Sequence, residues 1–117
     1  MVKWFHGGVP GLDVGDMLVS PSEHGKQATF SQYRHLPGAE VMRQDRVYAV
    51  RDKVAAAMYA GMYPHGDVYE VELLGEQRDD PDCTVPGYSV ECERARIVGV
   101  VRRRVRPEES AALMGVA

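Results

Sequence analysis

Three residues in this 117-residue sequence have types and settings suited to chemistry on a nucleotide: His6, Tyr48 and Asp80. His6 precedes Gly7 and Gly8, which let a ligand approach the backbone closely and hydrogen-bond to the imidazole. Tyr48 has small neighbours, so a planar group could stack on its ring. Asp80 lies in an acidic loop, where a carboxylate could stabilise the cation that develops during cleavage of a glycosidic bond. Their ordinary structural interpretations are a turn histidine, a cross-strand aromatic and a solvated turn aspartate.

The apolar pattern of the first half predicts the elements that position His6 and Tyr48. Residues 1–5 are predicted as a strand that runs into a His-Gly-Gly turn, and residues 17–19 as a short strand. Residues 46–50 alternate as a strand should, with Val47 and Ala49 on one face. Residues 53–62 then carry apolar side chains at helical spacing after a candidate N-cap, Asp52.

The second half predicts further antiparallel strands and a short final helix. Residues 68–73 and 95–101 are predicted strands, residues 79–82 an acidic loop, and a helix is expected to start at Pro107. Residues 22–45 lack periodicity and are interpreted as a long loop that could form a wall over a binding cleft. The predicted fold is therefore α+β: a single domain over residues 1–117 with an antiparallel sheet, one main helix and a short C-terminal helix.

Composition indicates a soluble globular protein, with 44% hydrophobic and 26% charged residues. No apolar run approaches the roughly 18 residues that span a bilayer, and the first residues do not resemble a signal peptide. We therefore expect a cytoplasmic protein without a membrane partner. Cys83 and Cys92 lack C-x-x-C spacing and a histidine close by in sequence, so we expect free thiols and no metal site.

Charge is unevenly distributed along the chain. The net charge of −3 argues against general nucleic-acid binding, yet six arginines lie near the C-terminus: Arg94, Arg96, Arg102, Arg103, Arg104 and Arg106. Such a cluster could bind phosphates. The pattern favours the simpler interpretation, a solvated strand face or a charged edge that prevents aggregation.

A collinear series of short motifs extends from residue 4 to residue 101. Its members are Phe5-His6-Gly7, Val14-Gly15-Asp16, Val47-Tyr48-Ala49-Val50, Ala55-Ala56-Ala57, Val68-Tyr69-Glu70-Val71-Glu72, Asp79-Asp80-Pro81, Pro86-Gly87 and Ile97-Val98-Gly99-Val100. In this order the series resembles the small bacterial rifamycin ADP-ribosyltransferases and their relatives in the ADP-ribosyltransferase superfamily.

The resemblance implies a split antiparallel sheet whose cleft holds NAD, as co-substrate, in a bent form. It implies that His6 binds the nicotinamide-side ribose and that the Gly7 backbone binds the carboxamide. Tyr48 would pack on the nicotinamide ring. Asp80 would take the acidic position of a His-Tyr-acidic triad and stabilise the ribosyl cation as nicotinamide leaves. No metal is required for this chemistry.

The implied activity is transfer of ADP-ribose to an acceptor hydroxyl or side chain, on a rifamycin-type antibiotic or a macromolecule. Gly7-Gly8 stands where the family has Gly-Thr, and residues 22–45 do not match the family, so the acceptor is open. One alternative is a catalytically inactive nucleotide-binding or protein-interaction module of the same fold. Another is a protein whose arginines contact an acidic partner or nucleic acid. An RNA 2′-phosphotransferase is disfavoured, because the motif loops present Asp79 and Asp80 instead of basic residues.

Overall fold

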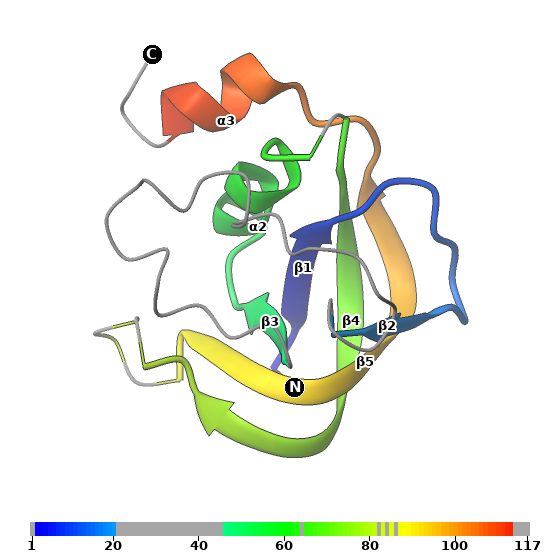
Figure 1. Cartoon of the computed structure of the whole chain (residues 1–117), viewed down its shortest axis with the longest axis vertical. Coiled ribbons are helices and arrows are strands. Elements are labelled where there is room, and N and C mark those ends of the chain that lie inside the picture. Colours follow the sequence, from blue (N-terminus) through cyan, green and yellow to red (C-terminus); the bar gives the residue numbers. More distant parts are fainter. Residues whose placement is uncertain are drawn as a thin grey trace.

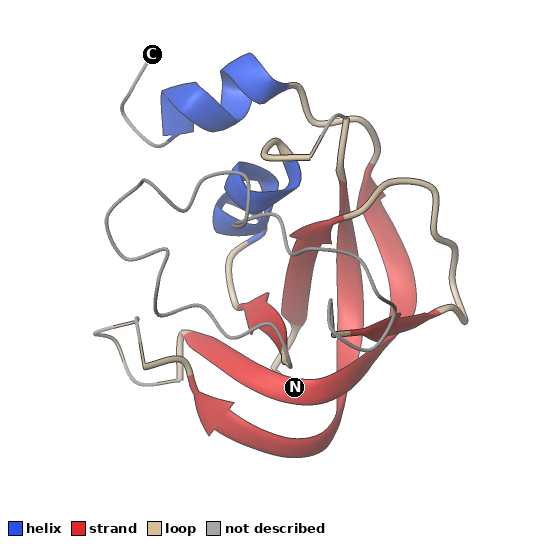
Figure 2. Cartoon of the chain, in the orientation of Figure 1, coloured by secondary structure: helices blue, strands red, loops and turns tan. Residues whose placement is uncertain are grey.

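Five strands and two helices make up the part of the chain that the computed structural model describes, residues 2–20, 46–63, 65–81, 83, 85 and 87–113. The predicted loop over residues 22–45 lies outside the described residues. Along the chain the elements are β1 (Trp4–Gly8), β2 (Met17–Val19), β3 (Val47–Val50), α2 (Lys53–Ala60), β4 (Asp67–Asp79), β5 (Ser89–Arg102) and α3 (Pro107–Leu113). The two helices lie toward one end of the molecule (Figures 1 and 2).

The strands form one antiparallel sheet in the order β2-β5-β3-β1-β4. A further ladder between β4 and β5 closes β1, β3, β5 and β4 into a ring. The long strands β4 and β5 curve through the molecule in Figure 1, and the register of their ladder shifts at three places, as β-bulges produce. An antiparallel sheet with two helices is an α+β fold, as the sequence predicted.

Strand alternation divides the apolar core between two clusters. The first is shared by β2, β3, β4 and β5 and contains Leu18, Val47, Ala49, Tyr69, Val71, Val90, Cys92, Ala95 and Ile97. The second packs the sheet against α2 and contains Phe5, Val50, Ala56, Ala57, Ala60, Val68 and Val105. Val47 and Ala49 therefore share a face of β3, as predicted, while Val50 packs on the other side.

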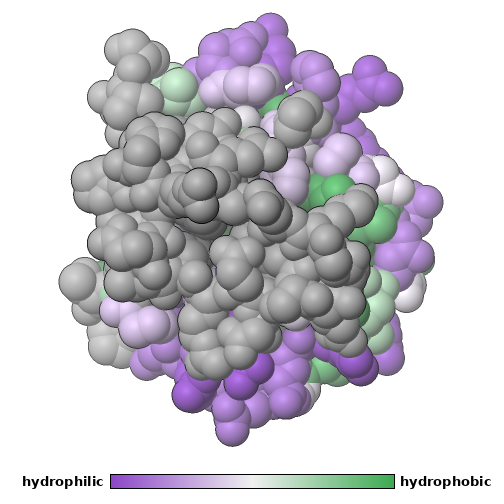
Figure 3. All heavy atoms as spheres, viewed as in Figure 1, coloured by the Kyte–Doolittle hydropathy of each residue, from purple (hydrophilic) through white to green (hydrophobic). Residues whose placement is uncertain are grey.

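Helix α2 begins where the sequence predicted because Asp52 caps it, accepting a hydrogen bond of 2.8 Å from the Val54 N–H. Helix α3 begins at Pro107, also as predicted. Its buried Ser110 donates a hydrogen bond to the Met58 carbonyl, which connects α3 to α2. The surface over the start of α3 is hydrophilic (Figure 3). Neither of these helices is long and apolar enough to span a bilayer, and the described part of the chain contains no other candidate.

Strand β1 differs from the prediction, because His6, Gly7 and Gly8 continue the strand instead of forming a turn. All three residues pair with β4. A Cβ added to Gly7 would fall on the carbonyl oxygen of Ala56 in α2, far inside van der Waals contact. Glycine at position 7 is therefore what allows the helix to lie directly against the strand.

Strands β4 and β5 are longer than the predicted segments 68–73 and 95–101. β4 extends to Asp79, which the sequence assigned to the acidic loop. The added parts contain charged residues, and these pair across the ladder: Arg78 lies opposite Glu91, and their side chains form an ion pair of 3.0 Å. A mixed polar sequence can therefore continue as a strand when its charges meet across neighbouring strands.

We predict that Gly7→Ala lowers the free energy of unfolding by about 2 to 3 kcal/mol, because the added methyl group must push α2 away from β1. Urea denaturation of the purified variants measures this. Gly99→Ala is the matched control, since a Cβ there meets only the Glu70 Cβ at 3.7 Å. Equal stability of the two variants would show that α2 does not lie on β1 as described.

Candidate functional site

His6 links the first strand to the third. Its Nδ1 lies 2.6 Å from the carbonyl oxygen of Tyr48, and because a carbonyl only accepts, Nδ1 carries the proton and donates. Burial of the ring lowers the pKa of His6 below its ordinary 6.5, and the hydrogen bond to Tyr48 offsets part of this effect. The imidazole is therefore neutral at neutral pH, with Nε2 as its acceptor.

Gly8 provides the space in which the imidazole lies. His6 and Gly8 are two residues apart on β1 and so face the same side of the strand. A Cβ on Gly8 would lie 2.6 Å from His6 Nε2. Glycine at position 8 thus makes room for the histidine ring.

Tyr48 is half-buried, and its hydroxyl is held by a neighbouring strand. It donates a hydrogen bond of 3.2 Å to Oε2 of Glu91, which lies opposite Tyr48 in the β3–β5 ladder. Glu91 is only 3% exposed, and its other oxygen, Oε1, lies 3.0 Å from Nη2 of Arg78. Tyr48, Glu91 and Arg78 thus form a polar row across β3, β5 and β4 that fixes the orientation of the tyrosine.

Asp80 directly follows β4 and is buried, with 7% of its surface exposed, so the solvated-turn interpretation is wrong. The Ser89 hydroxyl donates a hydrogen bond of 2.9 Å to its Oδ2. The Asp80 N–H in turn donates to the Ser89 carbonyl, also at 2.9 Å. Ser89 lies opposite Val50, the last residue of β3, in the β3–β5 ladder. The Asp80 carboxylate is therefore held at the start of β5, one strand away from the end of β3.

The structure brings His6 and Tyr48 into direct contact but holds Asp80 one strand away. Tyr48 and Val50 share a face of β3, and the β5 residues opposite them, Glu91 and Ser89, share that face of β5. The Tyr48 hydroxyl meets Glu91 there, and the Asp80 carboxylate meets Ser89.

His6 leaves β1 on the opposite face. The neighbouring residue Phe5 points toward α2 and packs in the second core cluster, so the His6 side chain points to the other face. On that face His6 lies opposite Tyr69, which belongs to the first core cluster. The imidazole therefore meets Tyr48 at the junction of the two strands and not across a shared face. We call this junction, residues 5–8 of β1 with residues 48–50 of β3, the β1–β3 seam.

The β1–β3 seam is paired at a single register, Phe5 opposite Val50, whereas β1 pairs with β4 along its whole length. The edge of Gly7 that faces β3 lies outside this ladder. Strand edges of this kind can hydrogen-bond a ligand through main-chain N–H and C=O groups. On its α2 side, Gly7 is closed by the Ala56 carbonyl.

Glu91 is the functional candidate that sequence reasoning missed. In the sequence Glu91 and Glu93 alternate with Val90 and Cys92, which is a strand signal with one charged face. That signal would have placed Glu91 outside the core. Its burial depends on Arg78 and Tyr48, which are brought to it by two different strands.

Cys83 and Cys92 are free thiols, as predicted, and burial raises the pKa of Cys92 to about 11, which suppresses its thiolate. Among the described residues, no group of three or more His, Cys, Asp or Glu side chains is arranged to hold a metal ion.

Neither the comparison with protein-family models nor the comparison with curated proteins gave a match to this chain. The site is therefore interpreted from its own residues.

We predict that His6 titrates with a midpoint below 6.5 in an NMR pH titration of its ring protons. Because the unfolded chain takes up this proton near 6.5 and the folded chain resists it, His6 should reduce stability as the pH falls below that value. Gly8→Ala should displace the ring and move the midpoint toward 6.5, while Gly99→Ala should leave it unchanged. A wild-type midpoint at or above 6.5 would contradict a half-buried neutral imidazole.

Proposed function

We propose that this chain is an NAD-dependent ADP-ribosyltransferase, which releases nicotinamide and transfers ADP-ribose to an acceptor hydroxyl or side chain. The observation that carries the proposal is the hydrogen bond from His6 to the Tyr48 main chain. It joins two members of the His-Tyr-acidic series at a sparsely paired seam, where a sheet of the ADP-ribosyltransferase type would have its split. Burial of Asp80, the third member, supports the same proposal.

Each residue of the seam has a binding role in this proposal. Neutral His6 offers Nε2 as acceptor for a hydroxyl of the nicotinamide-side ribose. The β3-facing edge of Gly7 offers main-chain groups to the carboxamide. Tyr48 offers its ring to the nicotinamide, and Glu91 holds the tyrosine hydroxyl so that this ring is oriented before the ligand arrives.

The proposed reaction breaks the bond between the nicotinamide nitrogen and ribose C1. The bonding electrons leave with nicotinamide, which becomes neutral, and positive charge develops on the ribosyl group. The buried Asp80 carboxylate stabilises that charge more strongly than a solvated carboxylate would, because water screens it less. The acceptor oxygen then bonds to C1 and its proton passes to water. The acceptor is a rifamycin-type antibiotic or a macromolecule.

A catalytically inactive nucleotide-binding or protein-interaction module of the same fold is the second candidate. The observation that favours it is the placement of His6, whose side chain leaves the sheet on the face opposite Tyr48 and Asp80. A dinucleotide held by His6 would then contact the seam without meeting the carboxylate. Such a module would bind NAD and leave it intact.

We predict that wild-type protein releases nicotinamide from millimolar NAD and that Asp80→Asn slows the release about a hundredfold. The amide can still accept the hydrogen bond from Ser89, so the fold is kept while the negative charge is lost. Asp79→Asn is the matched control, because it removes the neighbouring carboxylate, which accepts a hydrogen bond from the Gly87 N–H at an exposed position. Released nicotinamide is quantified by chromatography.

Thermal stability in the same NAD solutions separates the two candidates, since a ligand that binds only the folded state raises its stability. Stabilisation with release supports the transferase. Stabilisation without release selects the inactive module. Folded wild type that shows neither stabilisation nor release contradicts both NAD-binding proposals.

A further inference from the structure

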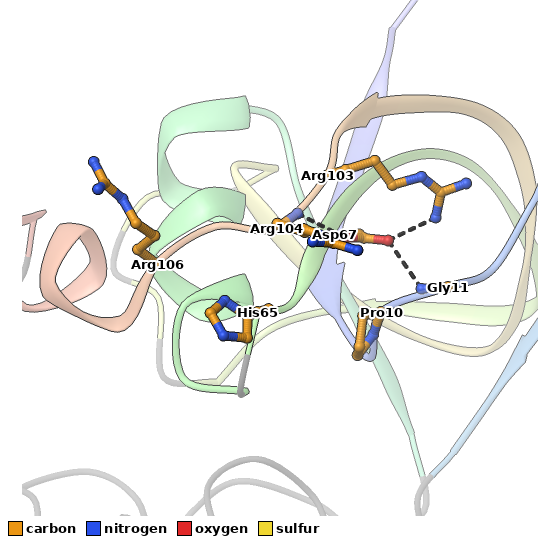
Figure 4. A pocket seen from close by; sticks show the side chains of 7 residues that line it. All are labelled: Pro10, Gly11, His65, Asp67, Arg103, Arg104 and Arg106. Carbon is orange, nitrogen blue, oxygen red and sulfur yellow. Dashed lines mark hydrogen bonds and ion pairs between the residues drawn. The ribbon is translucent and has the colours of Figure 1, made fainter.

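A pocket of about 760 Å³ lies between the loop after β1, the turn before β4 and the segment after β5 (Figure 4). It is lined by Pro10, Gly11, His65, Asp67, Arg103, Arg104 and Arg106. Three of these seven residues are arginines, although the whole chain carries a net charge of −3. We call it the arginine pocket.

A single buried carboxylate, that of Asp67, holds the walls of this pocket together. Asp67 is 1% exposed and accepts hydrogen bonds from the Gly11 N–H at 2.9 Å and the Arg104 N–H at 2.8 Å. Nη1 of Arg103 donates to it at 2.6 Å. Burial alone would raise the pKa of Asp67, but these hydrogen bonds and the charge of Arg103 hold it below 3.8. The three segments are therefore fixed by one ionised group.

The other arginines keep their charge available for a ligand. Arg103 is committed to Asp67 and, through Nη2, to Asp13 at 2.7 Å. Within the part of the chain that the structure describes, the Arg104 guanidinium makes no hydrogen bond or ion pair. Arg106 lies 3.9 Å from Glu108, and this pairing between two exposed side chains contributes little in water. Its charge also helps to lower the pKa of Glu109.

Two residues of the pocket have left-handed backbone conformations. His65 and Arg104 both have φ of 58°, which costs a residue other than glycine roughly 1 kcal/mol. Such conformations persist where surrounding contacts impose them, and they gather at ligand sites. At Arg104 those contacts are the hydrogen bond to Asp67 and the bond of 2.8 Å from the Val105 N–H to the Gly66 carbonyl.

We propose that the arginine pocket binds a phosphate group carried by a small organic ligand. The planar guanidinium of Arg104 presents paired N–H donors that match phosphate oxygens, and the fixed frame around Asp67 makes this donor part of a built site. A volume of about 760 Å³ exceeds the needs of a bare ion and suits a ligand of nucleotide size.

The pocket adjoins the β1–β3 seam. Asp67 lies opposite Gly8 in the β1–β4 ladder, and the His6 ring lies over Gly8. A dinucleotide with its ribose at His6 could therefore place its diphosphate among the arginines. Phosphate binding does not require the proposed transferase activity, because it depends on the arginines and the Asp67 frame alone.

The test is calorimetric titration of pyrophosphate and of ADP-ribose into wild type and Arg104→Gln. We expect the variant to bind pyrophosphate about tenfold more weakly, since it loses a charged hydrogen-bonding partner. Arg96→Gln is the matched control. Arg96 is an exposed arginine of β5 that pairs with Glu72 at 3.2 Å and does not line the pocket. It should bind within twofold of wild type. Arg106→Gln provides a second variant should Arg104→Gln misfold.

Two measurements on wild type and Arg104→Gln show whether the bound phosphate belongs to the dinucleotide: the titration with ADP-ribose and the KM for NAD in nicotinamide release. Weaker binding of ADP-ribose and a raised KM, together with weaker pyrophosphate binding, support the pocket as the site of the dinucleotide diphosphate. Weaker pyrophosphate binding alone supports a separate phosphorylated ligand.

The inference is overturned if folded wild type does not bind pyrophosphate. It is also overturned if wild type and both pocket variants, Arg104→Gln and Arg106→Gln, bind pyrophosphate equally well. A third contrary outcome is oligonucleotide binding that Arg96→Gln weakens as much as Arg104→Gln does. Nicotinamide release measured on the same samples keeps this inference distinct from the transferase proposal, because release without pyrophosphate binding overturns the pocket alone.

Discussion

Close packing on both faces of β1 positions helix α2, the seam and the arginine pocket. Gly7 lets α2 lie against one face, and Gly8 leaves space for the His6 imidazole on the other. One edge of the strand is fully paired with β4, and the other meets β3 at a single register. A side chain at either glycine would displace the helix or the histidine. The two glycines therefore serve packing and site geometry together.

Because β1 is fixed in this way, the seam and the arginine pocket are positioned by the same strand. The His6 ring lies over Gly8, and Gly8 lies opposite Asp67, whose carboxylate holds the pocket walls. A ligand that occupied both places would bridge a neutral hydrogen-bond acceptor and a cluster of positive charge. That combination suits a ribose that carries phosphate.

Local sequence patterns predicted local structure well. The start of α2 followed from Asp52 and the helical spacing after it, and the faces of β3 followed from alternation. Interactions between distant residues were not predictable. Glu91 is buried by Tyr48, 43 positions away, and Asp67 by Arg103, 36 positions away. The turn composition around Asp80 also allowed a solvated residue, yet Asp80 is buried and accepts a hydrogen bond from Ser89. The register between strands cannot be read from a single sequence, so pairs of this kind are identified only once the structure is known.

Binding of NAD at the proposed β1–β3 seam can be followed by NMR chemical-shift mapping with isotope-labelled protein. We expect NAD to shift the amide signals of Gly7, Gly8 and Ala49 and the ring signals of His6 and Tyr48, with saturation at millimolar NAD or below. Signals of the edge strand β2, which β5 separates from the seam, should stay in place. Unchanged seam signals at millimolar NAD, or shifts confined to other parts of the chain, would show that NAD does not bind at the seam.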